Sequence, residues 1–315
     1  MAAPYISKKK LVDNSLAGMP VISLNEVHFK LHILMKNISI RDMKCEHRSK
    51  VTPTVRTPQA ADWALSRGIT ALTTAEVAQL LGIPTSQVPQ RMAVPMRRHE
   101  WVTPARGLWV PVSPDYRAWG GPPALEFVPD LMGFLGADYY IGWLSAAALF
   151  GAAHQAPQAT QIATSRMIRN RQVGRARLEF YTRSGLPHLP VIERTVRTGR
   201  IRIAPPELTA LDLAANVMLG GGLDNVATVI VELSDDPGLD LDLLARTACG
   251  FSAASTRRVG WILDEFTGTK GLEPLMAVAS AADIRPSPLN PLSEARGKID
   301  KRWQIRINQD VQVEA

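Results

Sequence analysis

Side chains that could bind DNA gather between residues 85 and 106. Glutamine can form two hydrogen bonds to an adenine edge and arginine two to a guanine edge, while threonine and serine hydroxyls bond phosphate oxygens. The candidates are Thr85, Ser86, Gln87, Gln90, Arg91, Arg97, Arg98 and Arg106. These residue types favour contact with double-stranded DNA. A simpler interpretation stays open for Arg97 and Arg98, whose charge could merely solvate a helix end and favour its negative dipole there.

The sequence ahead of these candidates predicts two short helices. The first has Thr57 as its N-cap and Gly68 as its stop. In the second, Thr73 and Glu76 have the spacing of a capping box, in which each side chain bonds the backbone N–H of the other, and Gly82 ends the helix. Two such helices ahead of a third are typical of a helix-turn-helix motif.

Three prolines constrain the third helix. Pro84 precedes it, and Pro89 falls in its first turn, where a missing N–H costs little because the first N–H groups of a helix have no partner inside it. Pro95 would remove a hydrogen bond further along, so we expect the helix to end near Val94. This predicts a short DNA-reading segment from Ser86 to Val94, followed by a separate turn that carries two arginines towards phosphate.

The residues after this helix predict a β-hairpin. Apolar residues alternate on both sides of a turn at Pro104 to Gly107, a pattern typical of two antiparallel strands. The turn would hold Arg106 at the hairpin tip, where a wing meets the DNA backbone or minor groove. Three helices and a hairpin within residues 56–116 predict a winged helix-turn-helix DNA-binding domain.

The distribution of charge supports a polyanionic partner. The chain has 315 residues and a formal net charge of +7. Residues 1–120 hold 16 Lys and Arg against 8 Asp and Glu, whereas the remainder holds 20 against 21. All of the excess positive charge therefore lies in the first third of the chain, as expected for a module that binds nucleic acid joined to one with another task.

Composition argues against a membrane, secreted or metal-binding protein. No window approaches the roughly 18 uncharged apolar residues that a membrane helix needs, and the apolar stretch after the N-terminal lysines is broken by charged residues, unlike a secretory signal. Cys45 and Cys249 do not make a disulfide framework, which fits a reducing cytoplasm. Cys45 and His47 lack a second pair of ligands, so no metal site and no cofactor are expected.

Composition also divides the chain into four segments. Residues 1–55 lack clear periodicity and predict a poorly ordered basic extension, and residues 117–135, rich in proline, predict a linker after the domain at 56–116. Residues 136–315 predict a larger α+β domain, because strands and helices occur in separate runs. Its first helix is expected over residues 137–158, and its strands at 159–165, 176–182 and 199–205.

The ordered set of segments resembles the AbiEi-type antitoxins of bacterial type IV toxin-antitoxin (abortive infection) operons. The matching pieces are "EWVTPARGLWVPV", "YYIGWLSAAALFGAAHQAPQ", "PELTALDLA", "GGGLDNVATVIVEL", "RRVGWILDE" and "RWQIRINQDVQVE". Each piece consists of core and cap residues, and it is their order that is specific. The resemblance covers roughly residues 57 to 315, and residues 1 to about 50 match nothing in that family.

The resemblance implies a transcriptional autorepressor that is also an antitoxin. Its winged helix would bind inverted repeats in the promoter of its own operon, and its C-terminal domain would counteract a cognate nucleotidyltransferase-like toxin. We expect no catalytic activity and no catalytic residues. Two alternatives stay open: a winged-helix regulator with a ligand-sensing C-terminal domain, and a DNA-targeted nuclease or transferase, although no paired carboxylates followed by Glu-x-Lys appear in the sequence.

A second basic patch is expected in the C-terminal domain. Its five arginines lie within twelve positions and are Arg166, Arg169, Arg171, Arg175 and Arg177. Arginine could grip a phosphate backbone, an acidic toxin surface or a nucleotide carried by the toxin. The simpler interpretation is a solvated hairpin, with Arg175 and Arg177 pointing outward from a strand whose Leu178 and Phe180 point inward.

Overall fold

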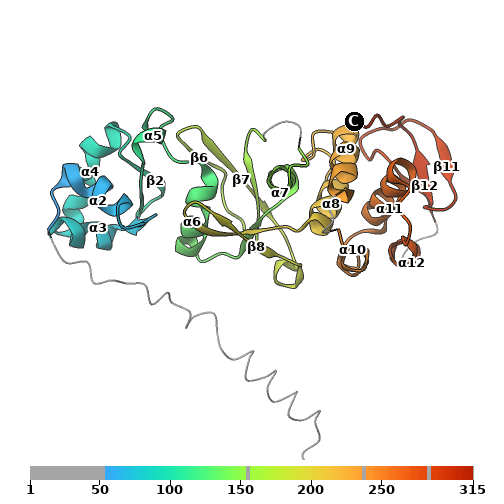
Figure 1. The fold of residues 1–315 in the computed structure, drawn as a ribbon, viewed down its shortest axis with the longest axis horizontal. Helices are drawn as coiled ribbons and strands as arrows, with labels where there is room; N and C mark the ends of the chain where they lie inside the picture. Colours follow the sequence, from blue (N-terminus) through green and yellow to red (C-terminus); the bar gives the residue numbers. More distant parts are fainter. Residues whose placement is uncertain (1–53, 154–156, 236–238, 282–284, 315) are drawn as a thin grey trace, which may run out of the picture. The chain divides into compact units, whose positions relative to one another are not determined.

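The computed structural model of the protein describes residues 54–153, 157–235, 239–281 and 285–314 (Figure 1). The basic extension predicted for residues 1–55 falls almost entirely outside these ranges, as does the pair Cys45 and His47. The described residues combine helices with antiparallel and mixed sheets, which fits the α+β class that the sequence predicts. We describe it as an N-terminal region (residues 54–117), a sheet region (118–204) and a helical region (205–314).

The N-terminal region contains short helices and a small antiparallel sheet. Its elements are η1 (Thr57–Gln59), α2 (Ala60–Leu65), β1 (Leu72–Thr73), α3 (Thr74–Leu81), η2 (Thr85–Gln87), α4 (Val88–Arg97), β2 (Trp101–Ala105), β3 (Leu108–Pro111) and α5 (Pro114–Arg117). The three strands pair in the order β1-β3-β2. Two predicted helices and the predicted hairpin are therefore present, with the third helix differently bounded.

The capping box predicted for α3 is confirmed. The Thr73 hydroxyl accepts a hydrogen bond from the backbone N–H of Glu76 at 3.3 Å, and the Glu76 carboxylate accepts one from the N–H of Thr73 at 2.8 Å. The helix ends at Gly82, whose φ of 65° is left-handed, as predicted. Thr57 is not the N-cap of a helix: the chain enters a 3-10 turn after Arg56, and α2 begins at Ala60, two residues later than expected.

The prediction that Pro95 ends the third helix is wrong. Helix α4 passes through Pro95 and stops only before His99, which has a positive φ of 54°. The proline ring is buried, and the backbone N–H of Arg98 still bonds the carbonyl of Val94 at 3.1 Å. Packing of the ring thus offsets the missing N–H. Nor do the hydroxyls of residues 85 and 86 cap α4, because both residues lie in the preceding turn η2.

The hairpin β2-β3 is tighter than predicted. Ala105 pairs with Leu108, so only Arg106 and Gly107 form the turn, and Pro104 belongs to β2 rather than to the turn. Gly107 has a φ of 95°, a conformation that L side chains rarely adopt. Arg106 is exposed at the tip, where the sequence predicts it.

The sheet region is built around a mixed six-stranded sheet. Its elements are η3 (Ala124–Glu126), α6 (Val128–Leu135), β4 (Tyr139–Ile141), α7 (Trp143–Phe150), β5 (Thr160–Thr164), β6 (Arg171–Val173), β7 (Ala176–Thr182), η4 (Leu186–His188), β8 (Ile192–Val196) and β9 (Gly199–Ile203). The strand order is β6-β7-β5-β4-β9-β8. Strands β5 and β7 are parallel, as are β4 and β9, and the other neighbours are antiparallel.

Strand β4 corrects the expectation of one long helix over residues 137–158. Tyr139 and Ile141 belong to one apolar core and Tyr140 to the other, the period-2 alternation of a strand buried on both faces. Gly142 follows, and α7 begins at Trp143. The three strands predicted from the sequence correspond to β5, β7 and β9.

Each face of the sheet has its own apolar core. One core joins the sheet to α6 and to the hairpin β2-β3, through residues such as Leu131, Ile162 and Val110. The other joins it to α7 and the helical region, through residues such as Tyr140 and Leu211. The sheet therefore connects the N-terminal region with the helical region.

The helical region has five α-helices among its described residues. Its elements are α8 (Pro206–Ala215), α9 (Leu223–Ser234), α10 (Leu241–Ala248), α11 (Ala253–Ile262), the π-helical turn η5 (Leu263–Thr267), α12 (Glu273–Ser280), β10 (Ser287–Pro288), β11 (Lys298–Asp300) and β12 (Ile305–Ile307). Helix α8 starts at Pro206, the first residue of the segment "PELTALDLA", and is buried over nearly its whole length. The short strands form a sheet in the order β10-β12-β11.

A glycine in α11 makes room for a tryptophan that precedes β12. The Trp303 ring lies against Gly260 so closely that a Cβ there would collide with it. The indole N–H donates to Asp264 at 3.0 Å, and Arg302 pairs with the same carboxylate at 2.9 Å. The segments "GWILDE" and "RWQIRIN", singled out separately in the sequence, therefore pack on each other.

Alanine at Gly260 should destabilise the fold, although alanine normally favours a helix. We expect Gly260→Ala to lower the free energy of unfolding by roughly 1–3 kcal/mol, because the new methyl overlaps the Trp303 ring. The matched control is Gly133→Ala in α6, where an added Cβ meets nothing within 4 Å. That change should raise stability by roughly 0.5–1 kcal/mol. Denaturant unfolding of both variants would contradict this account if the two shifts had the same sign.

Candidate nucleic-acid interface

Helix α4 has one buried face and one exposed face. Val88, Met92 and Pro95 are buried, and their spacing of four and three residues places them on one side of the helix. The exposed residues of α4 and of the residue before it are Gln87, Pro89, Gln90, Arg91, Val94 and Arg97, with Arg98 directly after. The buried side fixes the helix against its own region and turns a polar, basic side outward.

All eight DNA-binding candidates are exposed. Gln87, Gln90, Arg91, Arg97 and Arg98 share the outward side of α4, and this set we call the α4 face. Thr85 and Ser86 lie just before it in η2, and Arg106 lies on the hairpin turn. Arg98 approaches Glu100 at 4.0 Å, but exposed ion pairs of this kind contribute little energy. The structure thus gathers seven candidates on α4 and its N-terminal turn, with the eighth on the hairpin.

Thr74 links the hairpin turn to the start of α3. Its backbone N–H donates to the carbonyl of Gly107 at 2.9 Å, and its hydroxyl accepts from the Trp109 indole at 3.0 Å. The pairing of β1 with β3 adds to this link. The position of Arg106 is therefore tied to the helices of the N-terminal region.

Two of the five arginines of the second patch bind backbone near the hairpin. Arg171 Nη1 donates to the carbonyl of Pro104 in β2 at 2.7 Å, and Arg166 Nη2 donates to the carbonyl of Leu135 at the end of α6. An added Cβ on Gly107 would lie 3.4 Å from the ring of Phe134, also in α6. The loop between β5 and β6 is thus attached beside the hairpin, and it exposes Arg169.

The other two arginines line a separate pocket. Arg175 and Arg177, at the β6-β7 turn and in β7, are exposed and border a pocket of about 220 Å³ together with Trp119. The backbone N–H of Arg175 donates to the carbonyl of Trp119 at 3.0 Å. Leu178 and Phe180 are buried, as the hairpin interpretation predicts. The structure therefore places Arg175 and Arg177 at this pocket, apart from the backbone contacts of Arg166 and Arg171.

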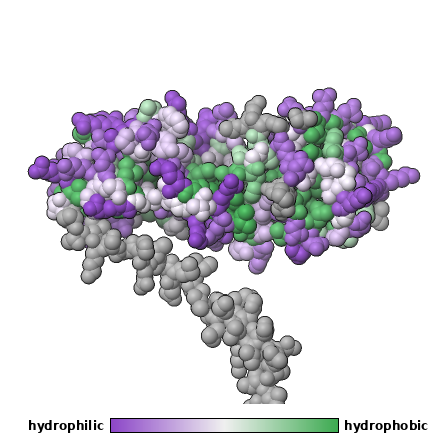
Figure 2. Space-filling model, viewed as in Figure 1, coloured by the Kyte–Doolittle hydropathy of each residue, from purple (hydrophilic) through white to green (hydrophobic). Residues whose placement is uncertain are grey.

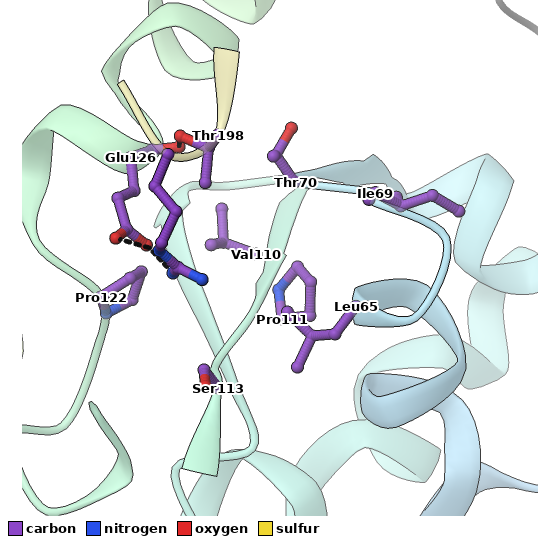
Figure 3. Close-up of a pocket in the computed structure, with 11 residues that line it drawn as sticks. Leu65, Ile69, Thr70, Val110, Pro111, Ser113, Pro122, Glu126 and Thr198 are labelled. Atoms are coloured by element: carbon purple, nitrogen blue, oxygen red, sulfur yellow. Dashed lines mark hydrogen bonds and ion pairs between the residues drawn. The ribbon is translucent and has the colours of Figure 1, made fainter. Parts of the chain in front are cut away.

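An ion pair that the sequence analysis missed borders a pocket between the N-terminal and sheet regions (Figure 3). Glu126 accepts a hydrogen bond from Arg197 Nε at 2.8 Å, a second from Arg197 Nη2, and one from the Tyr116 hydroxyl at 3.3 Å. Thr198 donates to the Glu126 carbonyl at 2.9 Å. The hydrogen bonds that Arg197 donates to Glu126 raise the pKa of Arg197. The pocket, of about 270 Å³, is also lined by residues of α2 and β3.

Hydrophilic residues dominate the visible surface of the N-terminal region, whereas apolar patches are larger over the sheet and helical regions (Figure 2). Within the part of the chain that the structure describes, no helix is long and apolar enough to cross a membrane. The same residues hold no group of three or more His, Cys, Asp or Glu that could bind a metal.

Residues 140–265 match the family model of the AbiEi antitoxin C-terminal domain. Over this part, the chain is similar to the AbiEi antitoxin family. The match confirms the resemblance inferred from the sequence, and it runs from β4 to the turn η5. It indicates an antitoxin role in a toxin-antitoxin system. We refer to residues 140–265 as the AbiEi domain match.

One solved structure extends the likeness beyond the AbiEi domain match. The crystal structure of the RV2827C protein from Mycobacterium tuberculosis aligns with a TM-score of 0.59 at 14% sequence identity. The alignment covers 80% of this chain and 92% of that chain. At this identity the likeness concerns the fold alone. Among curated proteins, no sequence matches the chain.

The AbiEi domain match contains a buried ionic cluster that the sequence analysis did not identify. Asp212, in α8, is 0% exposed, accepts a hydrogen bond from the Tyr140 hydroxyl at 2.8 Å and pairs with Arg183. Burial raises the pKa of Asp212 to about 6, although Arg183 and Tyr140 both act to lower it. The Arg183 guanidinium also stacks on Phe251, 4.5 Å from the ring centre. The cluster joins α8, β4 and the end of β7.

Two further arginines of the AbiEi domain match have structural roles. Arg257 donates to the carbonyls of Ala279 and Arg285 at 3.2 and 2.8 Å. Arg258 donates to the carbonyls of Leu289 and Ala214, and burial lowers its pKa to about 10. The "RRVGW" segment therefore holds loops onto α11.

Asp212→Asn should become less destabilising, relative to the parent, as the pH rises. The pKa of Asp212 is about 6 in the folded protein against a usual value of 3.8, so between these values the folded protein holds a proton that the unfolded chain lacks. The parent loses the stability that this proton contributes as the pH rises through 6. The free energy of unfolding of the parent minus that of the variant should therefore fall by roughly 1–3 kcal/mol between about pH 4 and about pH 7.5 in denaturant unfolding.

The control for this experiment is Tyr140→Phe, which keeps the carboxyl group. Its hydroxyl bond lowers the pKa of Asp212, so the variant should retain the pH dependence or strengthen it. A parent-minus-variant difference in unfolding free energy that stays flat with pH for Asp212→Asn would contradict a raised pKa of Asp212.

Proposed function

We propose that the protein is a DNA-binding transcriptional autorepressor and the antitoxin of a cognate nucleotidyltransferase-like toxin. The observation that carries the DNA-binding half is the α4 face, a row of exposed glutamines and arginines on a helix whose other side is buried. The antitoxin half rests on the AbiEi domain match. In this proposal the protein acts by binding and has no catalytic activity.

In this proposal residues 56–116 are a winged helix-turn-helix domain. The order of helices followed by a hairpin agrees with that architecture, with α4 as the recognition helix and β2-β3 as the wing. Residues 1–55 are the basic extension, 117–135 the linker and 136–315 the antitoxin domain. The domain limits remain those inferred from composition.

Helix α4 has a suitable length for the major groove. Its ten residues span about 15 Å. Gln87, Gln90 and Arg91, on its first turns, would read base edges, with Thr85 and Ser86 on phosphate. Arg97 and Arg98 would reach phosphate from the end of the same helix, rather than from a separate turn.

The hairpin and the neighbouring arginine loop would contact the flanking DNA backbone. Arg106 at the tip and Arg169 in the loop between β5 and β6 are both exposed, and the loop is bonded to β2 through Arg171. Arg175 and Arg177, at their own pocket, are the better candidates for an acidic surface of the toxin. This divides the second basic patch between two partners.

Arg91→Ala and Arg106→Ala should weaken binding to the DNA upstream of the protein's own gene. Loss of a base contact by Arg91 should cost about 1–3 kcal/mol of binding free energy. Loss of a phosphate contact by Arg106 should reduce by about 1 the slope of the logarithm of the binding constant against the logarithm of the salt concentration. Fluorescence anisotropy at matched salt measures both. The control is Arg200→Ala, since Arg200 is an exposed arginine of β9 that pairs with Glu193. Parent-like affinity of Arg91→Ala would contradict its assignment.

Neutralisation of the toxin should not require the α4 face. Expressed from a foreign promoter, the Arg91→Ala chain should protect cells from a nucleotidyltransferase-like toxin encoded beside it as well as the parent does, because the variant leaves the AbiEi domain match unchanged. Growth after toxin induction measures protection. Failure of the parent to protect would contradict the antitoxin half of the proposal, and Mg²⁺-dependent turnover of labelled nucleic acid by purified protein would favour the nuclease or transferase alternative.

A further inference from the structure

An apolar side chain interrupts the α4 face. Val94 is 44% exposed and stands in the middle of the polar residues of this face. Arg91 lies three residues before it and Arg97 three residues after it. Residues three or four apart on a helix are neighbours, with Cβ atoms about 5–6 Å apart. Val94 is therefore flanked by arginine on both sides.

Val94 is not part of the buried side of α4. The buried side of the helix is formed by Val88, Met92 and Pro95, while nearly half of the Val94 surface is open to solvent. A β-branched residue is also a poor helix former compared with alanine. The exposed apolar surface and the branching at Cβ both make valine an unfavourable residue at this position in the free protein.

We propose that Val94 recognises a thymine by contact with its C5-methyl group in the major groove. This inference rests on the proposed function of the α4 face as a DNA-reading surface. Thymine is the one base that presents a methyl group in the major groove, and apolar side chains recognise it by contact. The positive charge on either side of Val94 would hold the helix against the DNA, so that its two methyl groups face the base edges.

The proposal places the thymine beside a base pair read by Gln90 or Arg91. These residues lie four and three positions before Val94 on the same side of the helix. Adjacent side chains on a helix reach adjacent base pairs. The specificity of the site would then combine a hydrogen-bonded base with a neighbouring methyl group.

The test replaces thymine by uracil, which lacks only the methyl group. A footprint first defines the stretch of DNA upstream of the gene that the protein protects. Each thymine in that stretch is then changed to deoxyuracil, one position at a time, and the dissociation constant is measured for the parent and for Val94→Ala. Uracil at one position in each half of the inverted repeat should weaken binding of the parent about fourfold. This is the factor that burial of one methyl group supplies. Val94→Ala should bind the unmodified DNA more weakly and lose its sensitivity at that position.

Controls separate this inference from the wider proposal. Ile192→Ala removes a side chain of similar exposure, 41%, from β8 and should retain the full sensitivity to uracil. If no single uracil affects the parent, or if Val94→Ala keeps the same sensitivity, the thymine contact is wrong, while binding that depends on Arg91 leaves the proposed function intact. If the parent does not bind its own upstream DNA, both are wrong.

Discussion

Burial of the six-stranded sheet on both faces is the constraint on which the other features depend. Strand β4 sends Tyr139 and Ile141 to one core and Tyr140 to the other. The first core includes α6 and the hairpin β2-β3, and the second includes the helices of the AbiEi domain match. Because both cores share the strands, the α4 face and the buried Asp212 cluster are parts of one packed structure. Weakening the sheet would affect both proposed activities.

One local signal in the sequence predicted local structure closely. The Thr73 and Glu76 capping box was found because it acts within a few residues. Strand β4 was missed because its residues are buried on both faces and carry no polar alternation, next to an alanine-rich helix. Pro95 was misjudged for a related reason: the packing of its ring, which keeps α4 continuous, depends on residues outside the helix.

The difference between local signals and contacts with distant residues also applies to the candidate site. Glutamine and arginine on an amphipathic segment can be recognised from the sequence, and all eight candidates are exposed. The bonds between Glu126 and Arg197 join residues 71 positions apart, and the pair of Asp212 and Arg183 spans 29 positions. No spacing rule predicts such pairs. The AbiEi match was found from the order of core segments, several of which turn out to pack on one another.

Proline inside α4 also gives this helix a place where it can bend. Pro95 has no N–H to donate to the carbonyl of Arg91, so curvature at this turn stretches one fewer hydrogen bond than elsewhere in the helix. The residues proposed to read bases lie before this turn and the two terminal arginines after it. If α4 binds DNA as proposed, its last turn would be able to follow the path of a phosphate strand while its first turns keep their register on the bases.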